Sequence, residues 1–88
     1  MRLDKYLKVS RLIKRRTVAK EITVLERVEI NGRIAKPSSS VKINDQITLH
    51  LGLKIIIVEV TSLVPLKDEL MYSLVSESKV SKSSENIT

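Results

Sequence analysis

The spacing of hydrophobic residues changes once along this chain of 88 residues, and that change limits the possible folds. Up to about residue 25, apolar residues recur three or four positions apart, as Leu3 and Leu7 do, which is typical of helices. From Val28 to Thr61 they tend to alternate with polar residues, as in half-buried strands. The order predicts an α+β domain with two N-terminal helices packed on a small, mostly antiparallel sheet.

The helical part divides into two segments. The first helix is expected to begin near Arg2 or Leu3, with a break between Val9 and Arg16. Thr17 is the predicted N-cap of the second helix, because its hydroxyl can accept a hydrogen bond from a free backbone N–H. Helical spacing predicts that this second helix turns four side chains toward the core: Val18, Ala19, Ile22 and Leu25.

Turn signals separate the predicted strands. Asn31-Gly32 favours a tight turn after the strand that begins at Val28. A Pro- and Ser-rich loop at 37–40 and a turn at Asn44-Asp45 precede a strand at 47–51, and a β-branched strand follows at 54–61.

The chain is expected to form one domain followed by a short extension. Residues 1–65 are predicted to form the domain, and residues 66–76 an extension that packs on the sheet. Residues 77–88, which are polar and rich in Ser, are predicted to be a flexible tail.

Positive charge is concentrated in the N-terminal part. Residues 1–36 contain eleven Lys and Arg and four Asp and Glu, a net charge of +7, whereas residues 37–88 carry −1. A compact basic face of this kind suits a phosphate backbone. Since Tyr6 and Tyr72 are the only aromatic residues, the chain cannot build an aromatic platform for stacking bases. We therefore expect contacts with backbone and shape, with little sequence readout.

Several other classes of protein are disfavoured. The absence of Cys excludes disulfides and Cys-based metal sites, and no metal or cofactor is expected. The single histidine, His50, falls in a predicted strand and is expected to be a surface or edge residue, so we predict no enzyme activity. No signal peptide or membrane-spanning run is recognisable, which favours a cytoplasmic protein without membrane contact.

Four short motifs occur in an order that resembles the S-four RNA-binding domain, also called the alpha-L RNA-binding fold. They are Arg2-Leu3-Asp4, Arg16-Thr17, Ile30-Asn31-Gly32 and Asn44-Asp45-Gln46-Ile47. Each is weak alone, but the four together at these separations are specific. The opening MRLDKYLKVSRLIKRRT further resembles the RqcP family of stand-alone S-four proteins, which is related to the small heat-shock S-four protein.

The resemblance implies a non-catalytic factor of ribosome-associated quality control. Members bind stalled large ribosomal subunits that carry peptidyl-tRNA, contact both rRNA and tRNA, and stabilise the tRNA in the P site. They support alanine tailing by the elongator RqcH. We expect this chain to act as a monomer with the same partners: large-subunit rRNA, peptidyl-tRNA and RqcH.

The RNA-binding residues are expected around the starts of the two helices. Arg2 and Arg16 are the strongest candidates, and Asp4 is expected to orient a neighbouring arginine rather than touch RNA. The full predicted set is Arg2, Lys5, Lys8, Arg11, Lys14, Arg15, Arg16, Thr17 and Lys20.

The chain departs from the family pattern at two positions where glycine is usual. Glu26 follows the second helix and Asn44 precedes the Asp of the later turn. A glycine in such places allows a left-handed backbone, so we expect altered geometry or strain there.

Two alternatives remain open on sequence grounds. A general rRNA- or nucleic-acid-binding protein, active in ribosome assembly or nucleoid coating, would have the same basic face. An enzyme is the second alternative, because the same domain is appended to pseudouridine synthases and tyrosyl-tRNA synthetases, but we expect no catalytic domain in this chain.

Overall fold

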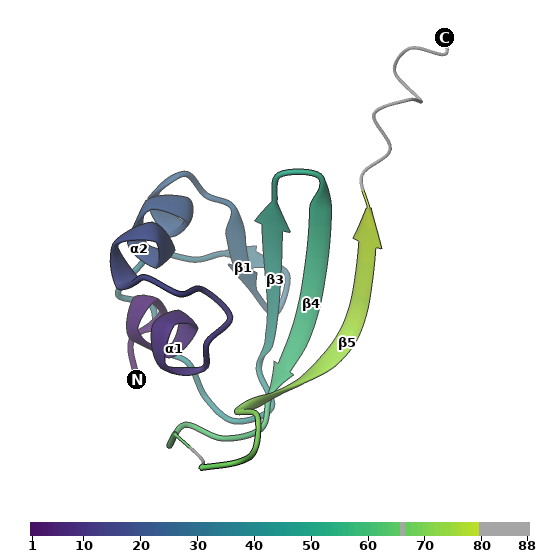
Figure 1. Ribbon diagram of the computed structural model, residues 1–88. Coiled ribbons are helices and arrows are strands. Elements are labelled where there is room, and N and C mark those ends of the chain that lie inside the picture. The colour runs from purple at the N-terminus through teal and green to yellow at the C-terminus, as the bar shows by residue number, and fades with distance from the viewer. Residues whose placement is uncertain (66, 80–88) are drawn as a thin grey trace, which may run out of the picture.

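The computed structural model describes residues 1–65 and 67–79 (Figure 1). Two helices come first, α1 (Leu3–Val9) and α2 (Arg16–Val24). The strands are β1 (Val28–Ile30), β2 (Arg33–Ile34), β3 (Gln46–Leu51), β4 (Lys54–Val60) and β5 (Tyr72–Lys79). The predicted break between the helices and the predicted order of helices before strands are confirmed.

The strands form one antiparallel sheet in the order β2-β1-β3-β4-β5. Both helices lie at the β1 side of this sheet, far from β5 (Figure 1). The predicted α+β class is therefore confirmed. No helix in the described part of the chain is long and apolar enough to cross a membrane.

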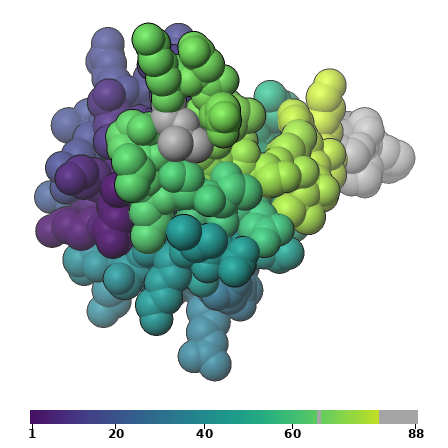
Figure 2. Space-filling model, turned by 90° about the horizontal axis from the view of Figure 1, so that it is seen from below, coloured from purple at the N-terminus to yellow at the C-terminus, as the bar shows by residue number. Residues whose placement is uncertain are grey.

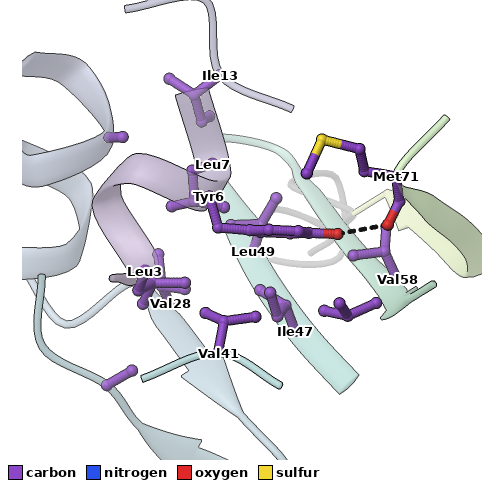
Figure 3. Packing of buried hydrophobic residues seen from close by; sticks show 13 residues of the cluster. Leu3, Tyr6, Leu7, Ile13, Val28, Val41, Ile47, Leu49, Val58 and Met71 are labelled. Atoms are coloured by element: carbon purple, nitrogen blue, oxygen red, sulfur yellow. Dashed lines mark hydrogen bonds between the residues drawn. The ribbon is translucent and has the colours of Figure 1, made fainter. Parts of the chain in front are cut away.

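The core fills the space between the helices and the sheet. Tyr6 and Leu7 of α1 are fully buried against Ile47 and Leu49 of β3 and Val58 of β4 (Figure 3). The Tyr6 hydroxyl donates a hydrogen bond of 2.8 Å to the carbonyl oxygen of Met71. This bond ties the first helix to the segment that leads into β5.

The N-terminal end of α1 is held by a distant loop. Leu3 N–H donates to Ser39 O at 2.8 Å and Asp4 N–H donates to Pro37 O at 3.1 Å. These carbonyls satisfy N–H groups that a helix leaves free at its start, and no side chain caps α1. Val41 N–H also donates to Met1 O at 2.9 Å, so residues 37–41 run beside the first residues of the chain. In Figure 2 the first residues of the chain, in purple, adjoin the blue-green residues near position 40 at the surface.

Four turn positions have a left-handed backbone that bears on the predictions. Asn31 and Gly32 have φ of 52° and 83°, which confirms the tight turn between β1 and β2. Glu26 and Asn44 have φ of 62° and 78°. The two sites where glycine is usual thus keep the left-handed backbone, and the residues present accept its conformational cost.

Two predictions for α2 are wrong. The helix begins at Arg16 with Arg15 as its N-cap residue, and no side chain caps it, so Thr17 is not the cap. Val18 and Leu25 do not face the core, because they are 38% and 63% exposed. Thr23 is buried instead. Burial of its hydroxyl costs little, because the hydroxyl donates a hydrogen bond of 2.6 Å to Ala19 O.

The boundary predicted for the tail is also wrong. Residues 77–79 belong to β5, where Glu77 and Lys79 pair with Ile56 and Lys54 of β4. The sequence of β5 lacks the apolar–polar alternation of a half-buried strand, because β5 is an exposed edge strand and its residues are mostly polar. The rest of the predicted tail lies outside the described residues.

Replacing Tyr6 with Phe tests the link between α1 and the segment before β5. Met71 O also accepts hydrogen bonds from Thr61 N–H and Ser62 N–H, so it would keep two partners. We expect a loss of about 1 kcal/mol in the free energy of unfolding, measured by urea denaturation. The control is Tyr72→Phe, because Tyr72 is only partly buried and we expect little change there. Equal losses in both variants would contradict this account.

Replacing Glu26 with Gly tests the cost of the left-handed backbone. We expect the free energy of unfolding to rise by about 1 kcal/mol, because glycine adopts this conformation without a Cβ penalty. The matched control is Glu21→Gly, which removes the same charge from an exposed site inside α2 and should lower stability by about 1 kcal/mol. A loss of stability in both variants would contradict the prediction.

Candidate nucleic-acid interface

The buried carboxylate of Asp4 lies at the centre of the basic region. Arg2 donates to it through two nitrogens, with Nε 3.1 Å from Oδ1 and Nη2 3.2 Å from Oδ2. The backbone N–H of Lys5 donates to Oδ1 at 2.8 Å, and Arg16 Nη2 lies 3.4 Å from the same oxygen. Asp4 therefore joins the residue before α1 to the first residue of α2. We call the side chains of Arg2, Asp4 and Arg16 the Asp4 cluster.

Both arginines of the Asp4 cluster remain accessible. The Asp4 side chain is only 3% exposed, whereas those of Arg2 and Arg16 are 52% and 49% exposed. One carboxylate cannot neutralise two guanidinium groups, so the cluster keeps a net charge of +1. The ion pairs therefore fix the direction of the two arginines without hiding them, and the predicted orienting role of Asp4 agrees with this geometry.

The electrostatic state of Asp4 follows from its surroundings. Burial alone would raise the pKa of this carboxyl group. The hydrogen bond from Arg2, the N–H of Lys5 and the charges of Arg16 and Arg2 together outweigh burial and hold the pKa below its ordinary value. Asp4 is thus ionised at neutral pH and keeps both arginines in place.

The remaining predicted RNA-binding residues are all exposed but do not all join this cluster. Lys20 lies one helical turn after Arg16 and lines a groove together with Arg2. Arg11 lies just past the opposite end of α1, has φ of 69°, and faces a hollow lined by residues 67–71. The others are distributed along α1, the connection between the helices and the start of α2: Lys5, Lys8, Lys14, Arg15 and Thr17.

Lys36 was missed by the sequence prediction. It lines the same groove as Arg2 and Lys20, although it follows them in the chain by at least sixteen residues. The hydrogen bonds from Leu3 and Asp4 to the loop at 37–39 bring it there. No local spacing in the sequence could indicate this approach, because it depends on how the loop passes α1.

His50 and Glu29 form a separate polar pair on the sheet. His50 Nε2 lies 2.9 Å from Glu29 Oε2, and the histidine side chain is 39% exposed. His50 is thus a surface residue as predicted, although β3 is a central strand rather than an edge. Within residues 1–65 and 67–79, no three His, Cys, Asp or Glu side chains gather as metal ligands would.

A family model and several curated relatives match this chain over most or about half of its length. The S4 domain model matches residues 1–47. A Streptococcus pneumoniae protein named RQC P-site tRNA stabilizing factor is 47% identical, with 91% of this chain and 96% of that protein covered. The Bacillus subtilis protein of the same name is 50% identical, with 91% and 98% covered.

A solved structure also matches. It is described as a trimeric structure of Vibrio cholerae Heat Shock Protein 15, and it superposes with a TM-score of 0.76 at 31% identity. The alignment covers 86% of this chain and 82% of that one. Since this alignment covers most of both chains, the structural likeness is not limited to the segment matched by the family model.

Replacing Asp4 with Asn tests the electrostatic role of the cluster. Because the pKa of Asp4 is lowered by folding, its contribution to stability is present above about pH 4, the ordinary carboxyl pKa, and is lost as pH falls through the lowered value. We expect Asp4→Asn to lose about 1–2 kcal/mol in the free energy of unfolding at pH 7 and to match the original chain in strong acid.

The control for this experiment is Glu21→Gln, which removes an exposed carboxylate from α2. We expect no comparable dependence on pH for that variant. A loss in Asp4→Asn that stays constant from neutral pH into strong acid would show that shape, rather than charge, explains the effect.

Proposed function

Because the chain belongs to the S4-domain family together with the RQC P-site tRNA stabilizing factors, we propose that it is an RNA-binding factor of ribosome quality control. In this proposal it binds stalled large ribosomal subunits that carry peptidyl-tRNA. Its basic N-terminal face contacts rRNA and tRNA and stabilises the tRNA in the P site.

The observation that carries this proposal is the Asp4 cluster. A guanidinium group can contact a phosphate through two parallel N–H groups, but only if it points the right way. Asp4 holds Arg2 from one side, and about half of each arginine side chain remains accessible. Two preoriented guanidinium groups lose less side-chain entropy on binding than two mobile ones would.

Other cations would extend the contact along both helices. We propose RNA contacts for the remaining predicted residues, all of which are exposed: Lys5, Lys8, Arg11, Lys14, Arg15, Thr17 and Lys20. Within the described part of the chain, the only ion pairs made by residues 1–20 are the two to Asp4. Most of the N-terminal charge is therefore available to phosphates.

The finer parts of the proposal come from the family. We propose that the chain acts in the cytoplasm as a non-catalytic monomer and supports alanine tailing by RqcH. Support for a binding role comes from the S4 domain and the names of the relatives. Positioning a tRNA requires affinity and a fixed orientation, and both can come from phosphate contacts.

A general nucleic-acid-binding role is the second candidate, because phosphate contacts alone do not select a ribosomal site. Sedimentation of cell extracts distinguishes the two. A quality-control factor should travel with large subunits that carry tRNA, and the amount bound should rise when subunits stall. A protein that coats nucleic acid should instead follow bulk RNA or DNA.

Replacing Arg16 with Ala tests the proposed face. We expect the affinity for large subunits carrying peptidyl-tRNA to fall about tenfold, and the dependence of log affinity on log salt to become shallower by about one. The fold should persist, because the Arg16 side chain is half exposed. Binding can be measured by sedimentation at several salt concentrations.

The matched control is Lys54→Ala, which removes a cation of similar exposure from the start of β4, where it is ion-paired with Glu77 as Arg16 is with Asp4. That variant should bind as the original chain does. Unchanged binding after Arg16→Ala, or an equal loss after Lys54→Ala, would contradict a specific N-terminal face.

A further inference from the structure

A groove lies between α2 and the segment that leads out of β2. Its volume is about 480 Å³. Three cations line it, and Val24 and Ile34 contribute aliphatic side chains that are 62% and 60% exposed. The three cations are Arg2, Lys20 and Lys36. The groove thus combines positive charge with exposed apolar surface.

This combination differs from what a duplex backbone needs. Phosphates require cations, but they gain nothing from Val24 and Ile34. A single unstacked nucleotide has both chemistries, since its phosphate is anionic and its base has an apolar face. In a duplex those faces are covered by neighbouring bases, so only an unpaired or extruded nucleotide could use the aliphatic residues.

Glu26 adds a third kind of group to the groove. Among the described residues, no cation lies within 4.0 Å of its carboxylate. A free carboxylate accepts hydrogen bonds from the N–H groups at the edge of a base. The groove therefore offers partners for a phosphate, a base face and a base edge.

We propose that this groove is a subsite for one unstacked RNA nucleotide. Arg2, Lys20 and Lys36 hold its phosphate, Val24 and Ile34 contact its base or ribose, and Glu26 accepts a hydrogen bond from the base edge. The inference rests on the proposed function, since it specifies which part of an RNA enters this site.

Continuity with the Asp4 cluster favours RNA as the occupant. Arg2 belongs to both the cluster and the groove. An RNA strand whose phosphates bind the cluster is therefore carried past the groove. By contrast, the hollow beside Arg11 is lined by two acids, Asp68 and Glu69, which equal its cations in number. The groove has three cations against one acid, so it attracts an anionic strand more strongly.

The test compares a short single-stranded oligonucleotide of adenosines with a fully paired RNA duplex of equal phosphate number. Val24→Ser should weaken binding of the single strand about threefold to tenfold and leave duplex binding unchanged. Lys36→Ala should weaken binding of both, because it removes a phosphate contact. Leu53→Ser, which changes an exposed leucine at the turn between β3 and β4, should change neither.

The outcomes separate this inference from the proposed function. If Val24→Ser and Leu53→Ser bind the single strand equally well, the subsite is wrong, although duplex and subunit binding can still support an RNA-binding role. If the original chain binds neither RNA nor large subunits, the proposed function itself fails.

A second measurement observes the groove directly. In NMR spectra of methyl groups, adenosine monophosphate should shift the signals of Val24 and Ile34, whereas inorganic phosphate should not. Shifts with phosphate alone, or none with the nucleotide, would overturn the base contact. Stronger shifts with an acidic amphipathic peptide than with the single strand would show that the groove binds protein instead.

Discussion

The carboxylate of Asp4 is the group on which the organisation of the N-terminal face depends. It is buried and yet ionised, because Arg2, Arg16 and the N–H of Lys5 all point at it. A buried charge without such partners would be strongly unfavourable. The arginine contacts that stabilise the buried Asp4 carboxylate also fix the two arginines. The same interactions therefore contribute to the stability of the fold and to the arrangement of the basic face.

This dependence explains why so small a protein can present an ordered basic surface. Long cationic side chains usually lose much of their freedom when they bind. Here Arg2 and Arg16 are already restrained by Asp4, and the loop at 37–39 restrains the start of α1 through backbone hydrogen bonds. The helices need only modest length, because their positions are set by these contacts and by the packing of Tyr6 in the core.

The sequence was sufficient for features that depend on local pattern. The change in spacing at Val28 predicted the order of helices and strands, and Asn31-Gly32 predicted its turn. Exposed elements were predicted less well, because their residues carry little pattern. Leu25 has the spacing of a core residue but lies past the end of α2, and the polar residues of β5 gave no strand signal.

The basic region was likewise predicted where it depends on local sequence and missed where it depends on tertiary contacts. Charge density predicted a basic N-terminal face. Arg16 contacts Asp4 twelve positions away, and of this contact only the orienting role of Asp4 was predicted. Lys36 could not be assigned, because its place beside Arg2 depends on tertiary contacts of the loop that follows it. Local sequence therefore predicts the chemistry of this face better than its full extent.

The most direct measurement is a cryo-electron microscopy structure of the chain bound to large subunits that carry peptidyl-tRNA. We expect Arg2 and Arg16 to lie within hydrogen-bonding distance of RNA phosphate oxygens while both still contact Asp4. A complex in which these two arginines face solvent, and another surface meets the RNA, would contradict it.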